Sequence, residues 1–311
     1  MQIGLLGFGK MGKMLAEKWL ADNHQVIVWN RSSEALQTLR AEKSEFIVSN
    51  KLVISRSAEE SFDSLIKPRI FWSMLPSGEP TNSMMEKILS MCERGDIIVD
   101  GGNSNFKDSE KWYAEFAKKG AKFLGIGVSG GIYLLNNGAS LMVGGDKEAY
   151  VYIKPLLDSL TKPNGSHGYF GTGGAGHFLK MVHNGIEYGM MQSLAEGFGV
   201  LAKSDYRFNM VDVSWIWQKG SIVRSFLLAM AIGAFAKDPG LAHTTGFINS
   251  TGEGEWTVNE AKAKGIPIEV IEKSLDFRKR SQYDTGVQQT FAAKLVAAMR
   301  GEFGGHSVKK Q

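Results

Sequence analysis

The segment IGLLGFGKMG (residues 3–12) places a short apolar strand directly before a G-x-G-x-x-G pattern, and the amphipathic segment KMLAEKWLADN (residues 13–23) follows. Strand, glycine loop and helix stand in the order that a dinucleotide-binding fingerprint requires. The first glycine allows a tight turn, the second lets the backbone approach a pyrophosphate, and the third lets the helix pack close to its strand. The N–H groups at the start of the helix favour phosphate charge. We therefore expect a dinucleotide to bind at Gly7, Phe8, Gly9, Lys10, Met11 and Gly12.

The second expected strand, QVIVWN (residues 25–30), bears on which dinucleotide binds. An acidic residue about 20 positions beyond the glycines would hydrogen-bond the ribose 2′-hydroxyl of NAD, and none stands here. Asn30, Arg31 and Ser32 instead offer donors, including a guanidinium suited to a 2′-phosphate. This pattern favours NADP. In the alternative interpretation, Arg31 stacks over the adenine edge, and both NADP and NAD bind.

Strand and helix signals alternate through the first half of the chain. Strands are expected at 69–75, 96–103 and 121–131, with helices near 80–92 and 107–119, which predicts a doubly wound, mainly parallel α/β sheet of the Rossmann type. Ligands bind beyond the carboxyl ends of such strands. Glycine-containing turns follow three of the strands, at 76–78, 101–104 and 129–131. One such turn is ordinary, but three favour a shared site, and we expect Leu75, Pro76 and Asn103 to contact the cofactor there.

From His177 onward the apolar residues recur with the 3.6-residue period of a helix. A long helix is expected over 177–203, followed by helices near 209–219, 221–236, 255–264, 267–281 and 286–299. Four glycines weaken the long helix by up to about 1 kcal/mol each relative to alanine, which close approach of another backbone or a ligand would explain; they are Gly185, Gly189, Gly197 and Gly199. The chain is thus expected to contain a dinucleotide-binding domain (1–175) and an all-helical domain (176–311).

Within the long helix, KMVHNGIEYG (residues 180–189) carries a polar stripe. Helical geometry places Lys180, His183, Asn184, Glu187 and Tyr188 on one face. Such residues usually form a solvated face. Two features oppose this interpretation: the other faces are apolar (Phe178, Val182, Ile186, Met190, Leu194), and the segment begins where the first domain ends, where ligand pockets tend to form. A desolvated lysine would have its pKa lowered and could act as a base, and a desolvated glutamate could act as an acid.

Composition excludes several classes of protein. The 36 basic and 32 acidic residues give a formal charge of +4 without a basic run, so no nucleic-acid partner is expected. The single cysteine, Cys92, cannot form an internal disulfide and has no CxxC neighbour. The N-terminus has no signal-peptide pattern. The longest apolar run, FLLAMAIGAFA (226–236), is shorter than the roughly 20 residues of a membrane span, so a cytoplasmic protein with no membrane partner is expected.

Three motifs resemble those of a known family: DGGNS (100–104), GVSGG (127–131) and GAGHFLKMVHNGIEYG (174–189). They are similar to 6-phosphogluconate dehydrogenase, the decarboxylating enzyme of the pentose phosphate pathway, and the length is similar to that of its short-chain branch. The resemblance implies oxidation of 6-phosphogluconate to ribulose 5-phosphate and CO₂, with NADP preferred, NAD possible and no metal.

The resemblance also implies individual roles. Lys180 takes the proton of the C3 hydroxyl and returns it to the ketone as CO₂ leaves, and Glu187 protonates C1. The residues implied to hold the carboxylate end and hydroxyls are Asn103, Ser129, Gly130, Gly131, His183 and Asn184, and Tyr188 and Arg278 hold the phosphate. In MRGEFGGH (299–306), Arg300 and His306 match a tail that reaches the substrate of the partner subunit, which implies a homodimer or a tetramer of dimers. Without the resemblance, both residues would be assigned to an ordinary helix end and tail.

The sequence departs from the long forms of the family at several positions. Thr251 and Glu253 stand where long forms carry a lysine and a threonine at the phosphate, Pro76 replaces a lysine, and residues 43–61 match poorly. Two rival functions remain. A β-hydroxyacid dehydrogenase of the 3-hydroxyisobutyrate type would share the fold and the lysine but would not need Tyr188, Arg278 and Arg300. A non-catalytic dinucleotide-binding protein would not need Lys180, Asn184 and Glu187 together.

Overall fold

The computed structural model describes residues 1–32 and 34–304. The chain folds as two compact units, the first comprising Met1–Met181 and the second beginning at Val182. Within the described residues, every helix is too short or too polar to cross a membrane.

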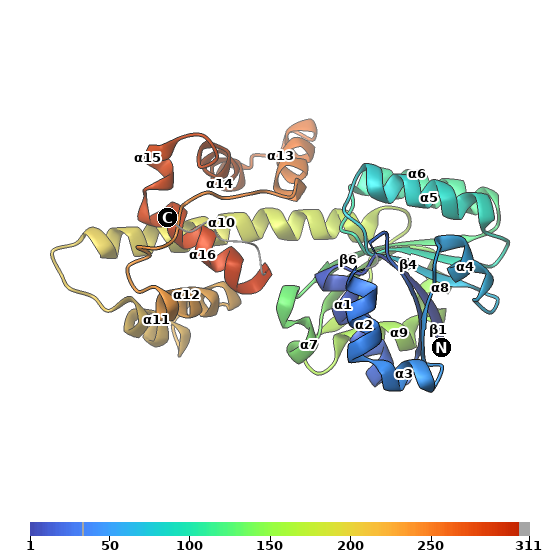
Figure 1. Ribbon diagram of the computed structural model, residues 1–311. Helices are drawn as coiled ribbons and strands as arrows, with labels where there is room; N and C mark the ends of the chain where they lie inside the picture. The colour runs from blue at the N-terminus through green and yellow to red at the C-terminus, as the bar shows by residue number, and fades with distance from the viewer. Residues whose placement is uncertain (33, 305–311) are drawn as a thin grey trace. The chain divides into compact units, whose positions relative to one another are not determined.

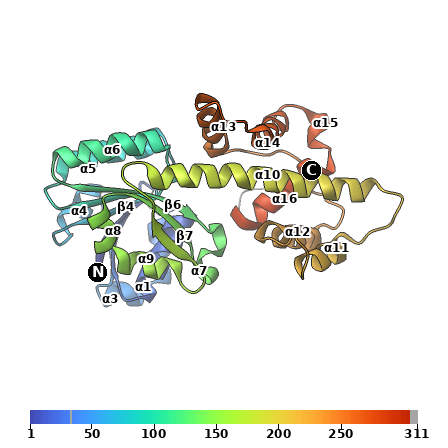
Figure 2. The ribbon, with the colours of Figure 1, turned by 180° about the vertical axis from the view of Figure 1, so that it is seen from behind.

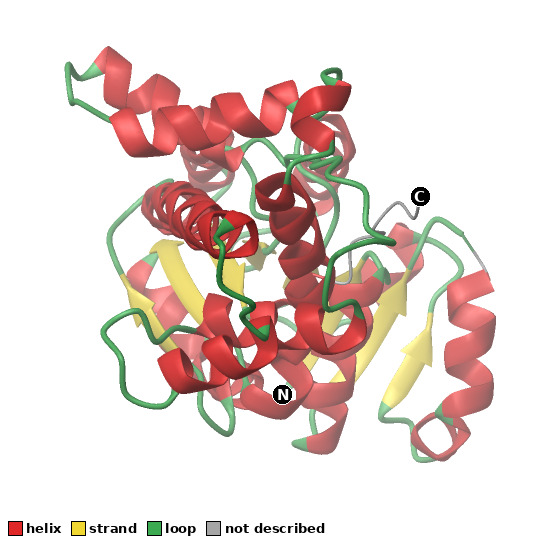
Figure 3. Cartoon of the chain, turned by 90° about the vertical axis from the view of Figure 1, so that its left-hand side faces the viewer, coloured by secondary structure: helices red, strands yellow, loops and turns green. Residues whose placement is uncertain are grey.

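A sheet of eight strands, counted over the described residues, forms the centre of the first unit (yellow in Figure 3). The strands are β1 (Gln2–Leu6), β2 (Gln25–Trp29), β3 (Leu52–Ile54), β4 (Ile70–Ser73), β5 (Ile97–Asp100), β6 (Lys122–Ser129), β7 (Ser140–Gly145) and β8 (Ser166–Tyr169). Their spatial order is β3-β2-β1-β4-β5-β6-β7-β8. Strands β1 to β6 pair in parallel, β7 is antiparallel to β6, and β8 is parallel to β7. The prediction of a mainly parallel, doubly wound sheet is confirmed.

Helices cover both faces of this sheet (Figure 1). They are α1 (Lys10–Ala21), α2 (Glu34–Glu42), α3 (Ser44–Val48), α4 (Ala58–Asp63), α5 (Glu79–Met91), α6 (Phe106–Lys118), α7 (Leu134–Asn137), α8 (Lys147–Tyr152) and α9 (Lys154–Thr161), with a 3₁₀ turn at Gly131–Tyr133. Trp19 of α1 and Leu156 of α9 belong to the core on one face. Met85 of α5 and Phe116 of α6 belong to the core on the other face. The poorly matching stretch 43–61 supplies α3, the edge strand β3 and the start of α4.

The strand order places a topological switch point beside β1. The chain moves from β1 through β2 to β3 on one side, and then returns to β4 on the other side of β1. Crevices at such points, outside the carboxyl ends of the strands, are the usual ligand sites of this fold. The loops that follow β1, β4 and β5 therefore meet at the edge where a dinucleotide is expected.

The long helix α10 (Ala175–Lys203) starts in the first unit and continues into the second. The other helices of the second unit are α11 (Met210–Gln218), α12 (Phe226–Lys237), α13 (Glu253–Ala263), α14 (Glu269–Arg280), α15 (Thr285–Gln288) and α16 (Phe291–Gly304). Within this unit, α13 and α14 lie on one side of α10. Helices α11, α12 and α16 lie on the other side, as both Figure 1 and Figure 2 show.

Two helix boundaries differ from the prediction because of side-chain caps. The helix expected from 221 begins at Phe226, since the hydroxyl of Ser225 accepts a hydrogen bond of 3.1 Å from the N–H of Leu228. The helix expected over 286–299 is divided into α15 and α16. The hydroxyl of Thr290 accepts a bond of 3.2 Å from the N–H of Ala293, which caps the start of α16.

Candidate active site

The glycine loop after β1 has the geometry that each of its glycines was expected to provide. Gly7 has a φ of +102°, and a Cβ there would lie 2.6 Å from the carbonyl oxygen of Met74. A Cβ on Gly12 would lie 2.2 Å from the carbonyl oxygen of Gly7, so α1 packs directly against the turn. A Cβ on Gly9 would meet no atom within 4 Å. The loop therefore has open space at Gly9, where a pyrophosphate would approach, and its residues fit a dinucleotide.

Asn30 connects this loop to the end of β2. The backbone N–H of Phe8 donates a hydrogen bond of 2.9 Å to Oδ1 of Asn30. Nδ2 of Asn30 donates in turn to the carbonyl and hydroxyl oxygens of Ser32, at 3.1 and 3.0 Å. The Asn30 side chain is thus used within the protein, while Arg31 and Lys10 are exposed. Of the three residues predicted to offer donors to a 2′-phosphate, Arg31 is the one whose charge faces solvent.

The turns after β4 and β5 pack against each other through glycine. A Cβ on Gly102 would lie 2.4 Å from the carbonyl oxygen of Leu75, and the carbonyl of Pro76 accepts a bond of 2.8 Å from the hydroxyl of Thr81. Asn103 has a φ of +55°, its Oδ1 accepts from the N–H of Val128 at 2.8 Å, and its Nδ2 donates to the Val128 carbonyl at 3.1 Å. These contacts bring together Leu75, Pro76 and Asn103. They also hold Asn103 beside the end of β6, where Ser129, Gly130 and Gly131 follow.

Lys180 lies where α10 approaches the sheet most closely. A Cβ on Gly127 would lie 2.4 Å from Cβ of Lys180, and a Cβ on Gly176 would lie 2.3 Å from the carbonyl oxygen of Gly125. Glycines on β6 and on α10 therefore let helix and strand meet without intervening side chains. Lys180 is 5% exposed as a result. This role of Gly127 was not predicted, although alternate glycines in a buried strand (GIGVSGG, 125–131) are a signal for close backbone approach.

The polar stripe of α10 turns inward. Lys180, Asn184 and Tyr188 are buried, whereas Ile186 and Met190 are 51% and 43% exposed. His183 and Glu187 are half-buried, and Nδ1 of His183 lies 2.9 Å from Oδ1 of Asn184. The expectation that the stripe is not an ordinary solvated face is consistent with this burial. The apolar residues on the other faces are less buried than the sequence pattern indicated.

A second group of predicted residues gathers inside the helical unit, around Tyr188. The guanidinium carbon of Arg278 (α14) lies 3.4 Å from the centre of the Tyr188 ring, and Nη2 of Arg278 is 3.4 Å from the sulfur of Met191. Burial lowers the pKa of Arg278 to about 10 and also lowers the pKa of Arg300 (α16). Burial raises the pKa of the Tyr188 hydroxyl, while the nearby charge of Arg278 opposes that rise. Arg278 and Arg300 are 2% and 7% exposed, and neither has a carboxylate within 4.0 Å in the described part of the chain.

Glu253, at the start of α13, belongs to the same group. It is 7% exposed, and it contributes to the electrostatic environment of both Tyr188 and Arg300. A Cβ on the next residue, Gly254, would lie 2.4 Å from Cε2 of Tyr188, so the first turn of α13 packs directly on the tyrosine ring. Glu253 was expected only to be a departure from the long forms, and no role in the site was predicted for it.

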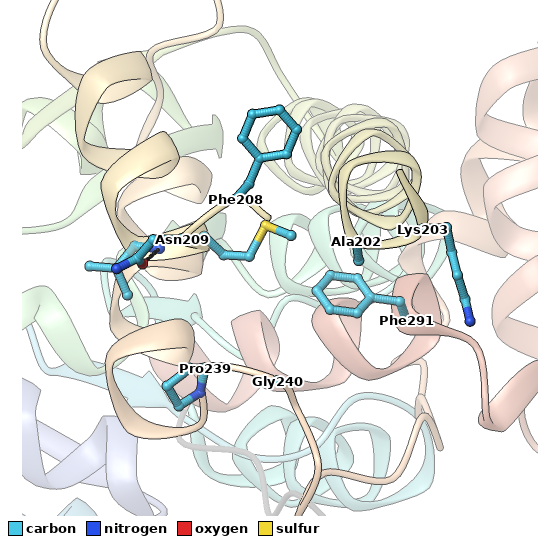
Figure 4. A pocket seen from close by; sticks show the side chains of 9 residues that line it. Ala202, Lys203, Phe208, Asn209, Pro239, Gly240 and Phe291 are labelled. Carbon is cyan, nitrogen blue, oxygen red and sulfur yellow. Dashed lines mark hydrogen bonds between the residues drawn. The ribbon is translucent and has the colours of Figure 1, made fainter. Parts of the chain in front are cut away.

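One predicted site residue, His306, is outside the described residues, so its predicted contact with substrate stays a prediction. The described part of the second unit contains an open cavity of about 530 Å³ near the end of α10, with Phe208 and Phe291 on different sides of it (Figure 4). No residue predicted to bind substrate or cofactor lines it. Among the described residues, no group of three or more His, Cys, Asp and Glu side chains is arranged to hold a metal ion.

A doubly wound sheet with a glycine loop at its switch point, followed by a helix that buries a lysine, defines the class of dinucleotide-dependent dehydrogenases. Comparison with family models identifies the family. Residues 2–173 match the NAD binding domain of 6-phosphogluconate dehydrogenase, and residues 176–296 match the C-terminal domain of 6-phosphogluconate dehydrogenase. The chain belongs to the 6-phosphogluconate dehydrogenase family.

Individual relatives match over the full length of the chain. A putative 6-phosphogluconate dehydrogenase of Bacillus subtilis is 40% identical over 100% of both chains. An NAD⁺-dependent, decarboxylating 6-phosphogluconate dehydrogenase of Haloferax volcanii is 32% identical over 100% of this chain and 99% of its own. The solved 6-phosphogluconate dehydrogenase of Plasmodium falciparum, described in apo form and with NADP⁺ or 6-phosphogluconate, is 30% identical with a TM-score of 0.80, over 91% of this chain and 62% of that one. Solved 3-hydroxyisobutyrate dehydrogenases are 18% and 15% identical, a likeness that shows the fold alone.

Proposed function

We propose that this protein oxidises and decarboxylates 6-phosphogluconate to ribulose 5-phosphate and CO₂. Residues 1–175 would hold the dinucleotide, and residues 176–311 would supply the phosphate-binding group and the subunit interface. Family membership supports the reaction, and the buried arginines of the helical unit support the phosphorylated substrate.

The observation that carries this proposal is the pair of buried guanidinium groups without a carboxylate partner. An unpaired buried charge costs several kcal/mol of stability. Arg278 and Arg300 each bear that cost in the absence of an anion within 4.0 Å among the described residues. A phosphate monoester, which carries close to two negative charges and three acceptor oxygens, would compensate both. Tyr188, stacked on Arg278, would add a hydroxyl donor.

The buried polar stripe of α10 supplies the acid and base chemistry. When bound, the dinucleotide would accept the hydride from C3 of the substrate. Lys180 would take the proton of the C3 hydroxyl and return a proton to the ketone oxygen as CO₂ leaves. Glu187 would then protonate C1 of the enediol. The carboxylate end and the hydroxyls would be held by Asn103, Ser129, Gly130, Gly131, His183 and Asn184.

NADP is the proposed preferred dinucleotide, with NAD possible. The exposed guanidinium of Arg31 follows β2, where an acidic residue would select NAD, and a 2′-phosphate could pair with it. The side chains of Asn30 and Ser32 bond each other and support the loop, so Arg31 carries the discrimination.

The functional protein is proposed to be a homodimer, or a tetramer of dimers, in the cytoplasm. Large apolar side chains of the helical unit are exposed in the single chain, among them Phe208, Trp215, Ile216, Ile222, Val223 and Phe226. Exposed large apolar side chains, when they gather on one surface, mark interaction sites. The cavity between Phe208 and Phe291 is lined in part by the start of α11 and would be covered by a second copy (Figure 4). Arg300 lies beside Tyr188 of its own chain, so a partner's tail would bring residues beyond Gly304, such as His306.

The rival functions leave these residues without a purpose. A β-hydroxyacid dehydrogenase acting on a small unphosphorylated acid would leave Arg278 and Arg300 buried without an anion. A non-catalytic dinucleotide-binding protein would have no use for a lysine buried against the sheet by Gly127.

An initial-rate assay with 6-phosphogluconate tests the proposal. NADP and NAD are compared as oxidants, released CO₂ is trapped, and gluconate and 3-hydroxyisobutyrate serve as alternative substrates. We expect one CO₂ per NADPH with 6-phosphogluconate and little turnover of the unphosphorylated acids. Turnover of 3-hydroxyisobutyrate without CO₂, and none of 6-phosphogluconate, would support the rival dehydrogenase.

A further inference from the structure

Glu253 places a carboxylate inside the cluster proposed to bind phosphate. Its Oε2 is buried and has no hydrogen-bond partner among the described residues. Two contacts fix the backbone at Glu253. Gly254 lets the first turn of α13 contact the Tyr188 ring, and the Glu253 carbonyl accepts a hydrogen bond of 2.8 Å from the hydroxyl of Thr257. A buried polar atom left without a partner is uncommon in proteins and indicates a missing donor.

The charged groups near this carboxylate are of both signs. Glu253 and Arg300 of α16 both influence Tyr188 and each other, and Arg278 of α14 and Glu187 of α10 complete the group around the tyrosine. The remaining charged pair nearby, Glu255 of α13 and Lys279 of α14, lies outside at 2.6 Å from each other, half exposed to solvent. The two guanidinium groups therefore lie in a cluster that also contains the buried carboxylate of Glu253 and the half-buried carboxylate of Glu187. A fully ionised phosphate would be attracted by the arginines and repelled by Glu253.

We propose that Glu253 is a specificity-determining residue that selects a protonated phosphate: its Oε2 shares one proton with a phosphate oxygen of the bound substrate. The shared proton supplies the donor that Oε2 lacks and removes the repulsion between the two anions. An anion that has no proton, such as sulfate, is excluded because it can only accept hydrogen bonds. The inference rests on the proposed function for the identity of the substrate, but the recognition of an anion by Glu253 can be measured without turnover.

The shared proton has a measurable consequence. The second pKa of a phosphate monoester is about 6, so at about pH 8 the phosphate group of the free substrate is a dianion. Binding at that pH must then take up about one proton from solution for each substrate bound. With Glu253→Gln, the amide donates directly to the dianion, and this uptake disappears. Glu255→Gln is the matched control, since it removes a carboxylate from the same turn of α13 that faces solvent and Lys279.

The experiment is calorimetric titration of the full-length protein with 6-phosphogluconate at about pH 8, in two buffers of different ionisation enthalpy. We expect wild type and Glu255→Gln to take up about one proton more per bound substrate than Glu253→Gln. Equal uptake by all three proteins would overturn the proposal.

Direct titration with inorganic phosphate and sulfate at constant ionic strength gives a second measurement that needs no variant and no substrate. Inorganic phosphate keeps a proton at neutral pH, whereas sulfate has none. Wild type should bind phosphate about tenfold or more tightly than sulfate, the worth of one charge-assisted hydrogen bond. Equal affinities for phosphate and sulfate would contradict the proposed role of Glu253. Phosphate selectivity without any binding of 6-phosphogluconate would instead retain that role and contradict the proposed substrate.

Discussion

The guanidinium of Arg278 lies over the ring of Tyr188, with its central carbon 3.4 Å from the ring centre. A desolvated contact of this kind contributes about 2 kcal/mol, which is less than the several kcal/mol that burying a charge costs. The contact therefore orients the arginine without compensating for its burial. The rest of the free-energy cost of burying the charge remains in the folded protein until an anion binds. Mutation of Arg278 should therefore affect both stability and substrate binding.

Arg278→Met is expected to raise the KM for 6-phosphogluconate by about 10- to 100-fold, since it removes charge-assisted hydrogen bonds worth about 1.5–3 kcal/mol. The free energy of unfolding should change by less than about 1 kcal/mol or increase, because the desolvated charge is removed with it. Steady-state kinetics and denaturant unfolding measure the two effects. Arg280→Met, at an exposed position on the same helix, should leave KM unchanged. An unchanged KM in Arg278→Met would exclude the arginine from the phosphate site.

Lys180→Met should lower kcat by about 10²- to 10⁴-fold, the range expected when a general base is removed. Cofactor affinity, measured by fluorescence titration with NADPH, should stay the same, because the glycine loop is a separate part of the first unit. Lys203→Met, at the exposed end of the same helix, is the control. Substantial residual turnover in Lys180→Met would remove the lysine from its proposed role.

Arg31→Asp should weaken NADP binding far more than NAD binding, since a carboxylate repels a 2′-phosphate and accepts a hydrogen bond from a 2′-hydroxyl. We expect a loss of about tenfold or more for NADP, from one charge-assisted contact. The dissociation constants of both dinucleotides check this. Equal losses would favour the alternative in which Arg31 stacks on adenine.

Gly127→Ala should destabilise the protein by about 1–3 kcal/mol, as overpacking does, because the added Cβ would lie 2.4 Å from Cβ of Lys180. It should also lower kcat, since Lys180 must move. Gly197→Ala is the matched substitution in α10: its Cβ would meet nothing within 4 Å, so helix propensity should stabilise it by up to about 1 kcal/mol. Unfolding and kinetic measurements on both variants separate steric crowding from a general effect of alanine. A Gly127→Ala protein of wild-type stability and rate would contradict the described packing.

Ile222→Glu should dissociate the proposed dimer, because a charge would enter an interface that buries exposed apolar side chains of α11, α12 and the loop between them. Sedimentation or light scattering should show a monomer for the variant and a dimer for the wild type. Val48→Glu introduces the same charge at an exposed position of α3 in the first unit and should remain a dimer. A dimeric Ile222→Glu protein would place the interface elsewhere.

The sequence predicted the parallel sheet and its glycine loop because their signals are local. Apolar strands, glycines at fixed spacing and an amphipathic helix are read within a few residues, and Gly7, Gly9 and Gly12 have the surroundings expected of them. Strands β7 and β8 were not anticipated. Both contain glycines and polar residues, as in SHGY (166–169), and they form through pairing with β6 and with each other rather than through local preference.

The polar stripe shows the limit of a pattern read from one chain. Its spacing predicted a single face and its position in the chain favoured desolvation of that face, but neither predicted that Ile186 and Met190 would be exposed. Helical periodicity tells which residues share a face, whereas burial depends on what packs against that face. The role of Glu253 was not predicted for the same reason: its sequence neighbours resemble a loop and helix start, and only the packing of Gly254 on Tyr188 brings it near Tyr188 and Arg300.

The hydrogen bonds of Asn30 have a consequence for redesign of the cofactor preference. Introducing an acidic residue at position 30 is an obvious route toward NAD, and an aspartate there would still accept from the N–H of Phe8. It would lose the amide donor to the Ser32 carbonyl and place negative charge against that oxygen. The Asn30 side chain thus connects the glycine loop after β1 to the turn after β2, so a redesign should keep Asn30 and vary position 31.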